Sequence, residues 1–81
     1  MAFKASYDAE NDVLYIEFSN KDVERTSALD DLRLVDYDAN NQPVGIEFIA
    51  ASEGLGLDHV PFADQIEAFL EQQGLHFPIF A

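Results

Sequence analysis

The sequence predicts an α+β domain: a four- to five-stranded, mainly antiparallel meander built from two similar hairpins, followed by one C-terminal helix. The first observation behind this prediction is a repeat, because YDAENDVLYIEF at 7–18 returns as YDANNQPVGIEF at 37–48 with seven of the twelve positions identical. The second is strand-like alternation within both copies, and the third is a helical period near the end of the chain. We expect one domain over 1–81, with the β-meander core in 3–57 and the helix and an apolar tail in 58–81.

Each copy of the repeat predicts a β-hairpin. Short candidate strands at 3–7 and 32–37 enter the hairpins, and the outgoing strands alternate with a period of two. Glu17 and Glu47 recur at outward positions. The inward positions are apolar in both copies: Leu14, Ile16 and Phe18, then Val44, Ile46 and Phe48.

Turn residues separate the strands of each predicted hairpin. Asp8 and Asp38 suit Asx-type turns, in which a side chain accepts backbone N–H groups further along the chain. Asn11 and Asn41 stand three residues later, where a left-handed residue is expected. Pro43 begins the second outgoing strand, a position that tolerates the loss of an N–H.

The segment between the copies predicts one further strand. SNKD at 19–22 reads as a turn, and the mixed polar VERTSAL at 23–29 as an edge strand. Asp30 and Asp31 then form a tight turn into 32–37, which is apolar on both faces. Such a strand needs cover on both sides.

After the second copy the pattern changes. The Gly-containing 51–58 predicts a loop, and 61–74 predicts an amphipathic helix with Pro61 in its first turn and Gly74 as its left-handed cap. The apolar face of that helix has i, i+4, i+7 and i+8 spacing: Phe62, Ile66, Phe69 and Leu70.

The charge balance limits the classes of partner. Sixteen acidic against four basic residues give a net charge of −12, which disfavours direct binding of nucleic acid. The acidity either solubilises a small protein or complements a basic partner protein. The absence of cysteine excludes disulfides, thiolate zinc sites and cysteine nucleophiles. No run approaches the roughly 20 apolar residues of a membrane span, and a cytoplasmic location is expected.

The loop carboxylates invite comparison with a calcium-binding loop. The second copy matches the ligand positions of that loop, and the first matches them partly: Asp36, Asp38, Asn40, Gln42 and Glu47, then Asp8, Glu10, Asp12 and Glu17. Two facts oppose a calcium site. Asn41 stands where the loop requires glycine, and Glu47 lies within a strand, about 10 Å from the loop. We therefore predict structural turns and no metal.

No catalytic or cofactor-binding residues are predicted. Ser52 lacks the glycine-flanked elbow of hydrolases, and GLG at 54–56 lacks the rest of a phosphate-binding loop. His59 and His76 are isolated. A non-enzymatic interaction module is favoured, and the alternative is a small hydrolase or metal-binding protein that uses loop carboxylates.

Several of these residues make the chain resemble the domain of unknown function 2283 family. The match covers roughly 3–57. The residues that resemble the family's motifs are Tyr7, Asp8, Asp12, Leu14, Tyr15 and Ile16, then Asp36, Asp38, Val44, Gly45, Ile46 and Glu47, then Ala51 and Ser52. No activity comes with the resemblance. It implies an antitoxin-like role beside a small toxin-like partner.

The uncharged tail is the predicted interaction surface. Its candidate interface residues are Leu75, Phe77, Ile79 and Phe80. The tail either folds back on its own sheet or packs against a second subunit, and the sequence favours the second arrangement in a homodimer, because so small a domain gains from a shared core.

Overall fold

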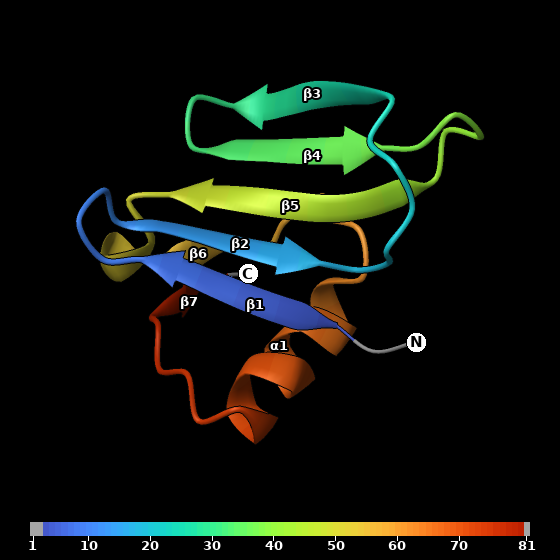
Figure 1. The fold of residues 1–81 in the computed structure, drawn as a ribbon. Helices are drawn as coiled ribbons and strands as arrows, with labels where there is room; N and C mark the ends of the chain where they lie inside the picture. The colour runs from blue at the N-terminus through green and yellow to red at the C-terminus, as the bar shows by residue number, and fades with distance from the viewer. Residues whose placement is uncertain (1–2, 81) are drawn as a thin grey trace.

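A computed structural model describes residues 3–80, and its main element is a five-stranded antiparallel sheet with the strand order β1-β2-β5-β4-β3 (Figure 1). The strands are β1 (Lys4–Asp8), β2 (Val13–Glu17), β3 (Arg25–Asp30), β4 (Arg33–Tyr37) and β5 (Pro43–Ile49). One C-terminal helix, α1 (Ala63–Gln72), completes the predicted α+β fold. The fold class is therefore confirmed, with five strands, and β3 occupies an edge as expected.

The strand order differs from that of a simple meander, in which each strand would lie beside the next. β2 neighbours β5 instead of β3, and the segment between β2 and β3 crosses the ends of the intervening strands (Figure 1). The physical reason is burial. β2 and β5 are the most apolar strands and take the centre of the sheet, whereas the polar β1 and β3 are left at its edges.

The two repeat hairpins keep the same register in their arms. Ser6 pairs with Tyr15 in the first hairpin, and the equivalent Asp36 pairs with Gly45 in the second. β2 and β5 meet antiparallel with Ile16 opposite Ile46, which are also equivalent positions of the repeat. The hairpins are thus related by a local twofold axis through this isoleucine pair.

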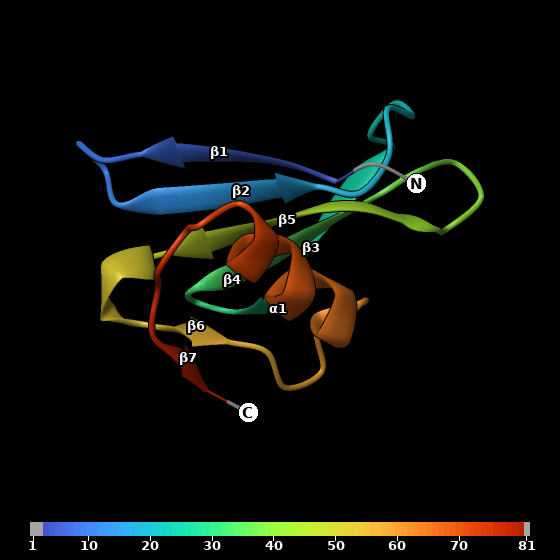
Figure 2. The same ribbon diagram turned by 90° about the horizontal axis from the view of Figure 1, so that it is seen from below.

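The remaining elements form a second layer on one face of the sheet. Figure 2 shows α1, β6 (Leu55–Gly56) and β7 (Ile79–Phe80) on the same side. A short 3-10 helix, η1 (Ala51–Glu53), leads from β5 into this layer. The core between the layers consists of buried apolar side chains: Leu14, Ile16, Phe18, Val35, Ile46, Phe48, Ala51, Leu55, Leu57, Val60, Ile66 and Leu70.

The helix is shorter than the predicted 61–74 at its N-terminal end. Phe62 adopts a left-handed backbone (φ 59°) and precedes the first helical residue, so Pro61 lies before the helix and not in its first turn. The C-terminal end matches the prediction. Gly74 is left-handed (φ 69°), and the amides of Gly74 and Leu75 close the last turn onto Glu71 and Leu70.

The segment predicted as a loop at 51–58 contains η1 and β6. β6 pairs in parallel with β7, with Leu55 opposite Ile79 and Gly56 opposite Phe80. Strands of two residues have no periodicity to detect, and this pairing depends on how the tail docks. Within residues 3–80 no helix is long and apolar enough to cross a membrane.

Candidate functional site

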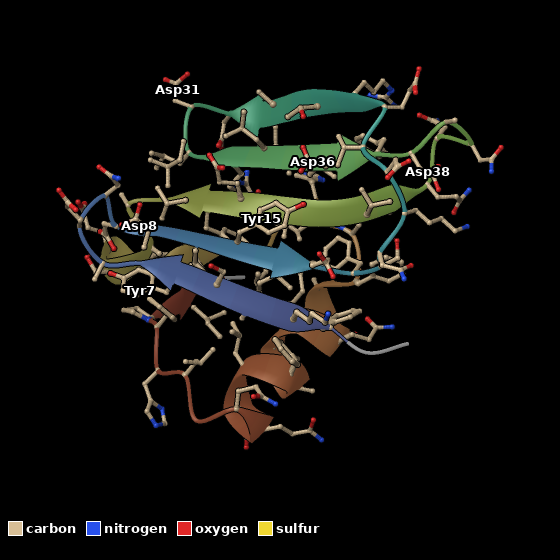
Figure 3. All side chains as sticks on the ribbon, viewed as in Figure 1. Tyr7, Asp8, Tyr15, Asp31, Asp36 and Asp38 are labelled. Carbon is tan, nitrogen blue, oxygen red and sulfur yellow. The ribbon has the colours of Figure 1, made fainter. Side chains whose placement is uncertain are left out.

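The face of the sheet opposite the helix has no covering element within residues 3–80 (Figure 2). The hydrogen-bonded Tyr15 lies at the centre of this face (Figure 3). The Tyr15 hydroxyl on β2 donates to Asp36 Oδ2 on β4 at 2.8 Å. Thr26 Oγ1 on β3 donates to Asp36 Oδ1 at 2.5 Å. The chain Tyr15–Asp36–Thr26 therefore spans the sheet from β2 to β3 and holds the phenol ring flat across β5.

Gly45 makes this arrangement possible. Tyr15 reaches Asp36 by passing over Gly45 of β5, and a Cβ at position 45 would lie 2.0 Å from the Tyr15 hydroxyl oxygen. A glycine inside a strand commonly marks such a close approach. The sequence held this signal, because the repeat places tyrosine at position 15 and glycine at the equivalent position 45, but the hydrogen-bonded trio was not predicted from it.

The electrostatics keep the central phenol protonated. Partial burial is the main cause that raises the pKa of Tyr15, followed by its hydrogen bond to Asp36 and by the charges of Asp36, Glu17 and Glu47. These carboxylates share the uncovered face, so its centre is acidic. We call the surface formed by Tyr15, Glu17, Asp36, Gly45 and Glu47 the acidic sheet face.

A second cluster ties the first hairpin loop to the end of β5. Asp12 accepts hydrogen bonds from Tyr7 Oη at 2.6 Å, from Ser52 N at 2.9 Å and from Ser52 Oγ at 2.6 Å. These bonds, led by that of the Ser52 hydroxyl, lower the pKa of Asp12. Each acceptor oxygen of Asp12 is engaged, so Ser52 serves as an anchor for the loop.

Both predicted Asx turns are present, with one correction. Asp8 Oδ1 accepts the amides of Glu10 and Asn11, and Asp38 Oδ1 accepts those of Asn40 and Gln42. In the second loop Asn41 is left-handed (φ 64°), as expected. In the first loop the left-handed residue is Asp12 (φ 55°) and not Asn11, because the pairing of Asp8 with Val13 leaves a four-residue loop.

Asp38 differs from Asp8 in its surroundings. Asp38 is 6% exposed, and within residues 3–80 its Oδ2 atom has no hydrogen-bond partner, while Lys21 Nζ lies 4.0 Å away. The calcium-loop positions do not converge around it. Asp36 points onto the acidic sheet face, and Glu47 lies further along β5 opposite Tyr15. Within residues 3–80 no three histidine, aspartate or glutamate side chains gather closely enough to hold a metal.

The predicted interface tail lies against its own chain. Leu75 and Phe77 are partly buried against the core, and the Phe77 ring contacts Tyr7 edge to face at 5.1 Å. Ile79 and Phe80 form β7, yet remain 38% and 55% exposed. Fold-back is thus the arrangement observed, and a role for the exposed end in association stays a prediction.

Several hollows open on the surface, and two of them show what their side chains are engaged with. One of about 510 Å³ is lined by aromatic and amide side chains, among them Phe3, Phe62 and Phe69. Another, of about 440 Å³, includes Asp30, Glu53 and Asp58. Two of these carboxylates, Asp30 and Asp58, bind the guanidinium of Arg33 at 2.8 and 3.1 Å.

Comparison with known proteins places the chain in a family, and the matched region contains both copies of the repeat. A family described as a protein of unknown function (DUF2283) matches residues 4–52, which include the Tyr7–Asp12–Ser52 cluster and the whole acidic sheet face. The chain belongs to this family. The uncharacterized protein MJ0789 of Methanocaldococcus jannaschii is 40% identical over 58 residues, covering 72% of this chain and 49% of that protein. The chain thus spans about half the length of this curated relative. No solved structure matches this chain.

Proposed function

We propose that this chain is a non-enzymatic interaction module that binds a basic protein partner through the acidic sheet face, in an antitoxin-like arrangement, and that it also associates with a second copy of itself. The observation that carries the proposal is the uncovered face, with a fixed aromatic ring at its centre and carboxylates around it. A structured but uncovered sheet face with an acidic centre favours a protein ligand.

The chemistry of the face defines the partner. Glu17 and Glu47 flank Tyr15 on the same face, where an arginine side chain of a ligand meets a carboxylate and an aromatic ring together. Arginine binds carboxylates in a two-pronged geometry and stacks on aromatic rings. The ring needs no reordering on binding, since Asp36 already holds it, and a preorganised surface loses less entropy.

The test is a titration of the isotopically labelled chain with a short arginine-rich peptide, followed by NMR. We expect shift changes centred on Tyr15, Gly45 and Glu47. The double variant Glu17→Gln/Glu47→Gln should weaken binding about tenfold, the equivalent of about 1.4 kcal/mol.

The matched control removes the same charge elsewhere. Glu67→Gln/Glu71→Gln neutralises two exposed carboxylates on α1 and should leave the affinity nearly unchanged. Equal weakening by the two double variants, or shift changes spread over α1, would mean that the acidity only solubilises the chain.

A further inference from the structure

Lys4 stands apart from the other basic residues. Three of the four basic side chains are engaged within the chain, each by a carboxylate or an aromatic ring: Arg33 by Asp30 and Asp58, Arg25 by the ring of Tyr37, and Lys21 by Asp38. In residues 3–80 no ion pair is found for Lys4, which is exposed on the edge strand β1 and lies opposite Glu17 of β2. Among the described residues, Lys4 is thus a basic side chain without an ion pair, and it lies on an edge of the sheet that no other strand covers.

The backbone of β1 can be divided into groups that bond to β2 and groups that do not. The amide of Phe18, the residue that follows β2, donates to the carbonyl oxygen of Val44 on β5 at 2.8 Å. Even-numbered residues of β2 therefore direct their backbone N–H and C=O groups toward β5, and odd-numbered residues direct theirs toward β1. This direction alternates from residue to residue along an antiparallel strand. Tyr15 pairs with Ser6, so the even-numbered residues of β1 direct their backbone N–H and C=O groups toward β2.

It follows that Ala5 and Tyr7 direct their N–H and C=O groups to the free edge. This edge is regular, since the β1–β2 register runs without a shift from Lys4 to Asp8. Proteins commonly protect such edges with bulges, prolines or charged side chains; β1 has no bulge and no proline, and Lys4 is its basic residue. The opposite edge strand, β3, has a register shift between Ala28 and Asp30.

We propose, on the basis of the self-association proposed above, that two copies of the chain join β1 to β1 in antiparallel fashion about Ser6, forming one continuous sheet. In this register Ala5 lies opposite the partner's Tyr7, and both residues present their free backbone groups to each other. Lys4 lies opposite the partner's Asp8, so the twofold axis creates two ion pairs. Opposite charges at facing positions stabilise antiparallel pairs.

The side chains of β1 support this register. Hydrogen bonds from Asn11 lower the pKa of Asp8, so its carboxylate is charged at neutral pH. On the inner face, small Ala5 faces the partner's large Tyr7, whose ring is held in its own chain by Asp12 and Phe77. A hollow of about 490 Å³ beside Ala5 leaves room for the neighbouring subunit to approach. Tyr7 is 41% exposed in the single chain.

The test compares two prolines. Ala5→Pro removes an outward N–H from β1, and Ala28→Pro is the matched change on the free side of β3. Sedimentation velocity over a range of concentrations measures the dimer, and circular dichroism checks the fold. We expect a weak, concentration-dependent dimer, because the contact is small, lost in Ala5→Pro and retained in Ala28→Pro. Hydrogen exchange at the Ala5 and Tyr7 amides should slow as concentration rises.

A charge change tests the same register without altering the backbone. Lys4→Glu places a carboxylate opposite the partner's Asp8 and should weaken the dimer about tenfold. Lys21→Glu makes the same change in net charge away from β1 and should have a smaller effect. Equal weakening by the two variants would contradict the assigned register.

The outcomes separate this inference from the broader proposal. A dimer that persists in Ala5→Pro, or is lost in Phe80→Ala instead, would overturn the β1 assignment and leave self-association intact. A chain that stays monomeric at high concentration in both low and high salt would overturn both. Higher salt should strengthen the dimer as the repulsion between two chains of net charge −12 is screened.

Discussion

The two repeat hairpins agree on the inner face of the sheet and differ on the outer face. On the inner face Ile16 and Ile46 sit opposite each other about the local twofold axis, and both are 0% exposed. On the outer face the equivalent positions 15 and 45 hold the largest and the smallest side chains of that face, Tyr15 and Gly45, packed one over the other. The repeat thus preserves the core, and its divergence creates the site.

The same contrast holds at the loops. Asp8 and Asp38 make equivalent Asx turns, yet Asp8 is exposed, whereas Asp38 is buried next to Lys21 of the β2–β3 crossover. The second hairpin is central and is covered by neighbouring segments, but the first has a free edge at β1. Position in the sheet, more than the repeated sequence, decides what each copy does.

The largest expected effect tests the shared inner face. Ile16→Ala and Ile46→Ala should each lower the free energy of unfolding by about 2–5 kcal/mol, because each leaves a cavity in the core. The two losses should be similar, since the sites are related by the local twofold axis. Denaturant midpoints measure them.

Glu17→Ala and Glu47→Ala are the outer-face controls and should stay within about 0.5 kcal/mol. A large loss at one isoleucine alone would show that the twofold relation has no energetic meaning. A larger loss at the glutamates would mean that the inner and outer faces had been exchanged.

The next effect tests the divergent outer face. Gly45→Ala should cost about 1–3 kcal/mol, because the added Cβ forces Tyr15 away from Asp36. In a Tyr15→Ala background the same substitution should cost much less, since the close contact that remains is the Ile16 carbonyl oxygen, 3.1 Å from the added Cβ. A double-mutant cycle measures the coupling. An equal loss in both backgrounds would mean that the backbone, and not Tyr15, requires glycine there.

The sequence predicted what depends on neighbours along the chain. The alternation of apolar and polar residues predicted the strands and their inward side chains. Asp8 and Asp38 predicted the turns, and Gly74 predicted the end of the helix. These features follow from local backbone preferences. They required no knowledge of how distant segments meet.

Long-range pairings were not predictable in the same way. A period of two assigns faces but not neighbours, so the contact between β2 and β5 was missed. The bond from Tyr15 on β2 to Asp36 on β4 crosses β5 and depends on that order. The left-handed residue moved from Asn11 to Asp12 because strand pairing, and not turn preference alone, fixes the loop length.

A smaller effect follows from the ionisation of Tyr15. Its pKa is raised in the folded chain, whereas in the unfolded chain the hydroxyl ionises near the ordinary value of about 10. The stabilisation is therefore fully present below about pH 10 and is lost as the pH rises above that value, because the unfolded chain then releases the proton first. Tyr15→Phe should flatten this alkaline loss, as measured by denaturant midpoints between about pH 9 and 11. An unchanged pH profile in Tyr15→Phe would show that other groups cause the loss.

Calcium should have the smallest effect, because neither hairpin loop converges its carboxylates on one point. In both loops the aspartate oxygen Oδ1 already accepts backbone amides, and Glu47 lies on β5 opposite Tyr15. A site with micromolar affinity would add about 4 kcal/mol at millimolar calcium, raising the melting temperature of a domain this size by roughly 15 °C or more. We expect no such shift in thermal unfolding with and without calcium.

Asp38→Ala distinguishes the loops, because a calcium shift that vanished in this variant would assign a metal site to the buried loop alone. The two hairpins would then differ in function as well as in their surroundings.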